Sequence, residues 1–313
     1  MIRSFALALC AAIALPLAST VQAAEAAPSE AQKRHRIGYG HLIDNDLIGD
    51  GKDRWRTGSV ASSRIYGYGW NGQAPANFGE LLELRFLGQI IAPDNLRNPA
   101  AGDRPWAGAL SLGLHTHMQR GSLEISLGGD LVFIGPQTGL DGFQDALHDL
   151  ANTTRPSDAV RHAQIPNTIR PTFVGELGKT ITLGPRSRLR PFVEARAGDE
   201  TLVRIGADLT LGTAGQGELL VRDPVTGQRY RTMYDTRGLS FTLGGDVAHV
   251  AQSVYLPEGR GYALNSRRDR LRAGLHWQGD GRDFFYGITY LGKEFSGQNT
   301  GQIVGSLRLR WTF

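Results

Sequence analysis

The chain has 313 residues and a formal net charge of +4, with lysine and arginine spread evenly along it. So small and dispersed a positive excess argues against a nucleic-acid-binding surface. The only cysteine, Cys10, lies near the N-terminus and follows Leu9 rather than a small residue, which excludes a lipoprotein anchor and a disulfide.

Residues 1–23 have the features of a secretory signal peptide. A short basic start with Arg3 precedes an apolar stretch over 5–18, and Val21-Gln22-Ala23 forms a small-x-small cleavage site. Cleavage there leaves 24–313 as one domain. In this remainder no apolar run approaches the roughly 20 residues that a membrane-spanning helix requires. If the mature chain crosses a membrane, it must therefore do so as a closed β-barrel.

Alternating polar and apolar residues recur at a spacing typical of β-hairpins and predict about twelve strands. In one segment, leucines alternate with Ser111, His115 and His117. The predicted strands cover 36–46, 57–69, 79–91, 105–119, 121–135, 168–183, 186–198, 201–213, 237–251, 268–279, 283–295 and 301–313.

The last predicted strand carries the clearest membrane signal. Its apolar face has Ile303, Leu307, Leu309, Trp311 and Phe313, and its polar face has Ser306, Arg308, Arg310 and Thr312. A soluble sandwich would have to bury two guanidinium groups, whereas a barrel wall places them in a wet lumen. The terminal aromatic residue resembles the C-terminal signature of bacterial outer-membrane barrels. An amphipathic edge strand of a soluble domain is the alternative.

These patterns predict an all-β fold, a transmembrane antiparallel up-and-down β-barrel in the outer membrane of a Gram-negative bacterium. An even strand number places both termini in the periplasm. The connections at the cell surface are then 46–57, 92–104, 135–168, 252–267 and 295–300. A Pro-x-x-Gly turn within 214–236 predicts a further hairpin, so fourteen strands are the alternative count.

The surface connection 135–168 has a helical pattern in place of alternation. Gln144 and His148 share one face, four residues apart, and the apolar residues at helical spacing are Leu140, Phe143, Ala146, Leu147 and Leu150. This spacing predicts a short extracellular helix that lies against the barrel rim. Long structured loops of this kind often carry function.

Polar clusters at the outer strand ends resemble the motifs of the outer-membrane lipid A 3′-O-deacylase family, the LpxR-like proteins. The matching residues, in order along nearly the whole mature chain, are Asn45-Asp46, Asp53-Arg54-Trp55-Arg56-Thr57-Gly58, Asp103-Arg104-Pro105-Trp106-Ala107-Gly108, Gly135-Pro136, Gln144 and His148. The sequence departs from the family where Arg56 and Trp106 replace tyrosines. It also lacks the Gly-Trp pair after the helix, whose place is taken by 159–167.

The resemblance implies a calcium-dependent esterase that removes the 3′ acyloxyacyl group of lipid A, the lipid part of lipopolysaccharide. His148 suits the base that activates water, with Gln144 orienting it. Asp46 and Thr57 are the expected metal ligands, with Asn45 beside them. Arg54 and Arg104, together with Thr57, would hold the substrate, the arginines through its phosphates. The chain has no Gly-x-Ser-x-Gly elbow, which favours water as the nucleophile.

Each of these expectations has a structural alternative. Residues 44–46 are also compatible with a plain turn, and the Asp-Arg pairs at 53–54 and 103–104 with lumen salt bridges. His115 and His117 can bind metal or fill the lumen. At the level of function, the alternatives are a non-catalytic barrel, either a small porin or an adhesin, and a phospholipase A-like esterase. The His-x-Ser pair of that phospholipase is not found, because Asp149 and Leu150 follow His148.

Overall fold

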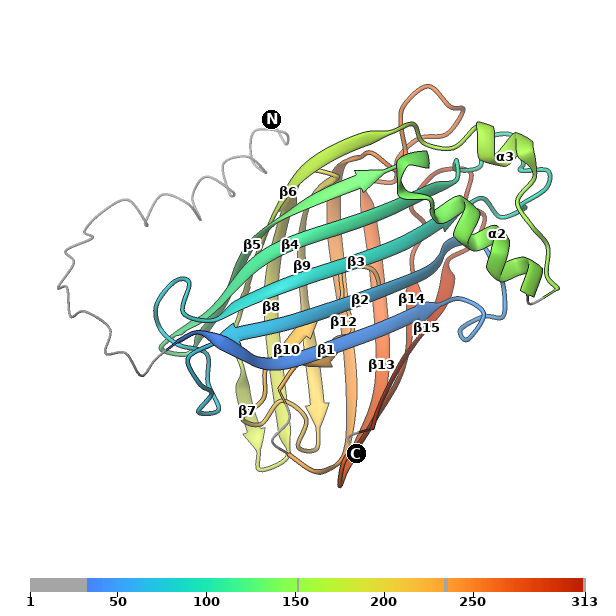
Figure 1. The fold of residues 1–313 in the computed structure, drawn as a ribbon. Helices are drawn as coiled ribbons and strands as arrows, with labels where there is room; N and C mark the ends of the chain where they lie inside the picture. Colours follow the sequence, from blue (N-terminus) through green and yellow to red (C-terminus); the bar gives the residue numbers. More distant parts are fainter. Residues whose placement is uncertain (1–32, 151, 234–235, 312–313) are drawn as a thin grey trace, which may run out of the picture.

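The computed structural model describes residues 33–150, 152–233 and 236–311. Its antiparallel strands form a continuous meander that closes where β1 pairs with β15 (Figure 1). The predicted signal peptide and Phe313 lie outside the described residues. The strands of the wall are β1 His35–Asn45, β2 Trp55–Gly67, β3 Leu82–Ala92, β4 Ala107–Arg120, β5 Leu123–Ile134, β6 Thr168–Gly178, β7 Ile181–Gly184, β8 Ser187–Ala197, β9 Glu200–Leu211, β12 Gly238–Ser253, β13 Arg267–Gly279, β14 Arg282–Leu291 and β15 Gln302–Trp311.

The wall has twelve strands, as predicted, because β6 and β7 together make one of them. Both pair with β8, one after the other along its length. Each predicted segment contains a strand, with boundaries that differ by a few residues. The all-β barrel predicted from alternation is therefore confirmed.

The two faces of the wall differ in polarity as a membrane barrel requires. On the outside, large apolar side chains such as Leu112, Phe241 and Leu271 are exposed, by 53%, 52% and 63%. Arg308 of β15 points inward, is 1% exposed, and forms an ion pair with Asp283. Among the described residues no helix is long and apolar enough to cross a membrane.

The hairpin predicted within 214–236 exists but does not belong to the wall. Its strands, β10 Leu220–Arg222 and β11 Arg229–Arg231, form a separate two-stranded sheet inside the barrel. Its backbone touches β1, where Tyr39 donates a hydrogen bond of 2.9 Å to the Thr232 carbonyl. Gly40 permits this approach, since a Cβ there would lie 2.4 Å from the Arg231 carbonyl oxygen. The fourteen-strand alternative is therefore wrong, because this hairpin fills the lumen.

Ion pairs and an apolar cluster fill the rest of the lumen. A single carboxylate, that of Asp246, forms ion pairs with Arg204, Arg270 and Arg272. Near the outer end, Tyr255 of the β12–β13 connection is 1% exposed and packs into a buried apolar cluster with Ile91, Ala107, Ala109, Val132, Ile134 and Ile165. This packing fills the lumen near the outer end on that side.

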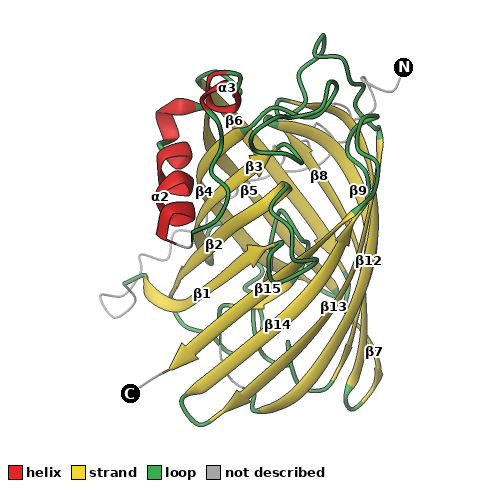
Figure 2. Ribbon diagram, turned by 90° about the vertical axis from the view of Figure 1, so that its right-hand side faces the viewer, coloured by secondary structure: helices red, strands yellow, loops and turns green. Residues whose placement is uncertain are grey.

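The long connection between β5 and β6 contains the predicted helix, α2 Leu140–Leu150, flanked by η2 Pro136–Thr138 and α3 Asp158–His162. Figure 2 shows α2 and α3 together beside the barrel. On the side of α2 that meets the barrel, Gln144 is buried and Leu140 packs against the buried cluster around Trp106. Phe143, Leu147 and Leu150 are 55%, 46% and 87% exposed. The helix was predicted correctly, but most of its apolar stripe faces outward, as surrounding lipid would permit.

Candidate active site at the outer rim

The β1–β2 loop brings two carboxylates together around one hydroxyl group. Asp46 follows β1 directly, and its Oδ1 accepts a hydrogen bond of 3.1 Å from Thr57 Oγ1. The same hydroxyl lies 2.5 Å from Oδ1 of Asp53. The Arg54 amide donates to Oδ2 of Asp46 over 2.8 Å, which fixes the carboxylate against the loop. Asp46, Asp53 and Thr57 are called the rim cluster below.

A local irregularity of β2 aims Thr57 at these carboxylates. In the pairing with β3, Arg56 lies opposite Ile91 and Gly58 opposite Ile90, so Thr57 is an extra residue of a β-bulge. Trp55, just before it, has a φ of 51°, in the left-handed region that few non-glycine residues adopt. Strained backbone of this kind is characteristic of functional sites.

His148 reaches the rim cluster from α2. Its Nδ1 lies 2.6 Å from the Thr154 carbonyl oxygen, and since a carbonyl cannot donate, Nδ1 must carry the proton of this bond. The other nitrogen, Nε2, lies 3.2 Å from Oδ2 of Asp53. Nε2 therefore faces the rim cluster. It donates to Asp53 when the ring carries both protons, and once it has lost its own proton its lone pair points to the position from which a general base acts.

Gln144 attaches the helix to the barrel. Its Oε1 accepts a hydrogen bond of 2.7 Å from the indole nitrogen of Trp106, and both side chains are buried. Trp106 stands where the family has a tyrosine, and its indole N–H supplies a hydrogen-bond donor in place of the tyrosine hydroxyl. Gln144 lies one helical turn before His148, so this bond fixes the part of α2 that presents the imidazole.

Gln302 of β15 holds the loop from the other side. Its Nε2 donates to Asp46 Oδ2 over 3.2 Å and to the Arg54 carbonyl over 2.6 Å. Neither Gln302 nor Asp53 was singled out from the sequence as a site residue. Asp53 stands in the Asp-Arg motif, whereas alternation marks Gln302 only as lumen-facing and gives no sign of its partner.

Other predicted site residues lie nearby in different roles. Oδ1 of Asn45 accepts the Leu47 amide over 2.8 Å, which is the Asx turn that the sequence offered as an alternative. Arg54 is 7% exposed at the rim, where its guanidinium stacks on Trp55 and contacts Asp94 over 3.1 Å. His115 and His117 bond to Asp130 and Glu83 inside the lumen, consistent with a filling role.

Arg104 lies below the rim and is only 1% exposed. It forms an ion pair with Glu294, which also binds Arg56 over 2.9 Å and Arg268 over 3.2 Å. This position favours the internal salt bridge over phosphate contact. Arg56, the other departure from a family tyrosine, is likewise neutralised by buried carboxylates, Glu294 and Glu200.

The electrostatics of the rim cluster favour a bound cation. Burial raises the pKa of Asp46 to about 7, the charges of Asp53 and Asp50 add to the shift, and the bonds from Arg54 and Thr57 oppose it. Carboxylate and hydroxyl oxygens are the donors that calcium prefers. The oxygen atoms of the rim cluster are therefore of the kind that binds a hard cation such as calcium. Within the part of the chain that the structure describes, no group of three or more His, Cys, Asp or Glu side chains is arranged to hold a metal.

Comparison with known proteins identifies the family. The family model described as outer membrane protein LpxR matches residues 5–313. The chain belongs to the LpxR family. Among solved structures, LpxR from Salmonella typhimurium aligns with a TM-score of 0.73 and 18% identity, covering 88% of this chain and 100% of that chain.

Other solved outer-membrane barrels resemble this LpxR-family protein less closely. An outer membrane channel from Pseudomonas putida F1 has a TM-score of 0.43 and 11% identity, over 92% of this chain and 100% of that chain. The β domain of the Bordetella autotransporter BrkA has a TM-score of 0.39 and 11% identity, over 88% and 98%. No curated protein sequence matches the chain. The family and the barrel place this LpxR-family protein in the outer membrane, and at family level they support lipid A deacylation.

Proposed function

We propose that this LpxR-family barrel hydrolyses the ester that links the 3′ acyloxyacyl chain to lipid A, with water activated by His148. The observation that carries the proposal is the contact between His148 and the rim cluster, which joins two segments remote in sequence. The site lies at the outer end of the barrel, where lipid A of the outer leaflet can reach it. This LpxR-like arrangement has one base and neighbouring oxygen donors, as hydrolysis by water requires.

Asp46, Asp53 and Thr57 would hold calcium, through their carboxylate and hydroxyl oxygens. When bound, the ion would polarise the ester carbonyl as a Lewis acid and offset the charge that develops on its oxygen. Gln302 and the Arg54 amide position Asp46, and the bulge at Thr57 positions the hydroxyl. Asn45 shapes the turn that leads out of β1 and so acts on the site through its backbone.

His148 performs the proton transfers. Its Nε2 takes a proton from the attacking water as the new carbon–oxygen bond forms, and then gives that proton to the oxygen of the departing alcohol. The Thr154 carbonyl keeps Nδ1 protonated throughout, so the two nitrogens have fixed roles. Asp53 stabilises the imidazolium through its carboxylate, 3.2 Å from Nε2 in the described state.

The outward stripe of α2 gives the site an apolar side for acyl chains. Phe143, Leu147 and Leu150 are exposed next to a helix face that holds His148. Exposed apolar groups of this kind match the hydrocarbon of the substrate and of the surrounding lipid. Of the two arginines we assign phosphate contact to Arg54, whose partner Asp94 is exposed at the rim, whereas Arg104 is held by the buried Glu294.

The experiment is hydrolysis of purified lipid A by the purified barrel in detergent. We expect release of fatty acid with calcium, none after chelation, and none from the His148→Ala variant. Migration of the unheated barrel on gels checks that each variant is folded. Release by a folded His148→Ala variant at the wild-type rate would remove the proposed base, and no release by the wild type with calcium would contradict the proposed activity.

A further inference from the structure

A cavity of about 260 Å³ lies inside the barrel, far from the rim cluster. It is lined by residues of the β2–β3 and β9–β12 connections, including Trp70 and Gly215, and it is therefore open toward the periplasm. Its walls come from β4, β5, β6 and β8 on one side and from the β10–β11 hairpin on the other. Toward the cell surface, the buried cluster around Tyr255 fills the lumen next to β3, β4 and β5. The cavity thus lies at the periplasmic end of the lumen.

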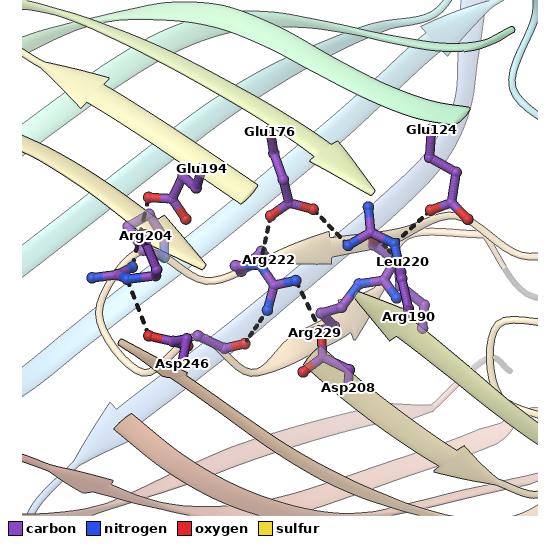
Figure 3. Close-up of polar contacts among 12 residues, drawn as sticks. Glu124, Glu176, Arg190, Glu194, Arg204, Asp208, Leu220, Arg222, Arg229 and Asp246 are labelled. Atoms are coloured by element: carbon purple, nitrogen blue, oxygen red, sulfur yellow. Dashed lines mark hydrogen bonds and ion pairs between the residues drawn. The ribbon is translucent and has the colours of Figure 1, made fainter. Parts of the chain in front are cut away.

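Arginine outnumbers acid along the cavity. Six arginines and four glutamates line it, and no aspartate does. Most of these arginines have carboxylate partners. Arg190 contacts Glu124 and Glu176 over 2.6 and 2.7 Å, and Arg222 contacts Glu176 and Asp208 over 2.6 and 2.9 Å (Figure 3).

Arg229 is one of two exceptions. It lies directly across the hairpin from Arg222, and like charges at such a pair destabilise a sheet. Figure 3 shows its side chain among those of Arg190 and Arg222, and the bond drawn from it goes to the Leu220 carbonyl, 3.3 Å away. Among the described residues no carboxylate lies within 4.0 Å of its guanidinium, although it lines the cavity and is only partly buried.

Arg188, two residues before Arg190 on the lumen face of β8, also has no carboxylate in direct contact. It is 9% exposed and donates to two carbonyl groups, those of Gly212 and Ala214. Its Nη1 is buried without a hydrogen-bond partner among the described residues, and it forms no ion pair there. A buried N–H group left in this state has lost its hydrogen bonds to water without gaining one in the protein. Among the described residues neither arginine has a carboxylate in direct contact: Arg229 interacts with Glu124 and Asp208, and Arg188 with Glu218, only at longer range.

We propose that this periplasmic cavity binds a phosphate-bearing solute through Arg229 and Arg188. A guanidinium offers two parallel N–H groups that match phosphate oxygens, and Arg is the residue best suited to such pairing away from bulk water. The bound anion would give Arg229 the direct partner that Arg222 already has and would tie the hairpin to β8. Free phosphate and the phosphate of a phospholipid head group share this chemistry. The site is separate from the rim cluster and does not depend on the deacylase proposal.

The test is a calorimetric titration of the folded barrel with inorganic phosphate, in chloride buffer of constant ionic strength and without lipid A. We expect saturable binding that raises the thermal unfolding midpoint. Binding should weaken by about tenfold or more in Arg229→Gln and in Arg188→Gln, the loss of roughly one charge-assisted contact. Arg186→Gln is the matched control, because Arg186 is exposed and does not line the cavity.

Two outcomes overturn the proposal: no saturable binding to the wild type at millimolar phosphate, or binding that the folded Arg229 and Arg188 variants retain at the affinity of the Arg186 control. If Arg229→Gln does not fold, Arg229→Lys, which keeps the charge but loses the paired N–H geometry, is judged by the same comparison. Glycerol 3-phosphate, used as a second titrant, separates the sources. Tighter binding than phosphate supports a lipid head group, and equal or weaker binding supports the free anion.

Discussion

Nε2 of His148 lies 3.2 Å from Oδ2 of Asp53, and this contact joins the extracellular helix to the loop between the first two strands. Asp53→Asn keeps the shape of the side chain and removes its charge. We expect kcat to fall by about 10–100-fold, the usual loss when a group that supports a catalytic or metal-bound residue is changed. Steady-state kinetics with lipid A at saturating calcium measures this, with Asp280→Asn, an exposed carboxylate in the turn between β13 and β14, as the control. Wild-type kcat in a folded Asp53→Asn variant would contradict the role given to Asp53.

The bond from Trp106 to Gln144 is predicted to hold α2 in its working position. Trp106→Phe removes the donor and leaves the buried Oε1 of Gln144 without its partner, at a cost of about 1–3 kcal/mol. We expect lower activity and faster proteolysis between residues 139 and 167. Trp277→Phe is the matched control, because Trp277 is 40% exposed on the outside of the barrel. Equal proteolysis of the two variants would show that the bond does not secure the helix.

Calcium affinity is predicted to fall as the pH drops through neutrality. The pKa of Asp46 lies near 7, above its usual range because of burial, so the carboxyl group is protonated below that pH and ionised above it. A proton and calcium compete for the same oxygens, so the apparent affinity should weaken by up to about tenfold per pH unit below 7. Calcium titrations between about pH 8 and pH 6 measure this. A pH-independent affinity, or one unchanged in Asp46→Asn, would remove Asp46 from the metal site.

The internal hairpin is predicted to be needed for the stability of the barrel. In Gly40→Ala the new Cβ would lie 2.4 Å from the Arg231 carbonyl oxygen, so the hairpin must shift away from β1. Crowding of this kind costs about 1–3 kcal/mol. We expect a lower thermal unfolding midpoint than in Gly184→Ala, where the added methyl group meets nothing within 4 Å. Equal midpoints would mean that the hairpin does not press on β1.

The wall of the barrel was predictable because strand alternation is a local property of the sequence. In β15, alternation alone assigns Leu309 to the outer face and Arg308 to the lumen face, with no information from any other segment. The inner hairpin was not placed correctly, because β10 and β11 alternate like wall strands and only long-range contacts put them in the lumen. For α2, the spacing of apolar residues predicted the helix correctly. It did not predict which side faces the barrel, because the apolar side of a helix packs against protein in a soluble domain but can face lipid next to a membrane barrel.

The candidate site was predictable in residue type and only partly in geometry. The motifs led to Asp46, Thr57, Gln144 and His148, which the structure gathers at the rim. The burial of Arg104 could not be foreseen, because its partner Glu294 stands 190 positions away in the chain. The bulge that directs Thr57 toward both carboxylates likewise depends on pairing with β3 and has no local sequence signal.

Mass spectrometry of lipid A from cells that express the protein tests the central claim most directly. The account predicts that lipid A from cells with the wild-type barrel loses the mass of its 3′ acyloxyacyl group, and that lipid A from cells with the His148→Ala barrel keeps it. An unchanged lipid A profile with the wild-type barrel folded in the outer membrane and calcium supplied would contradict the account.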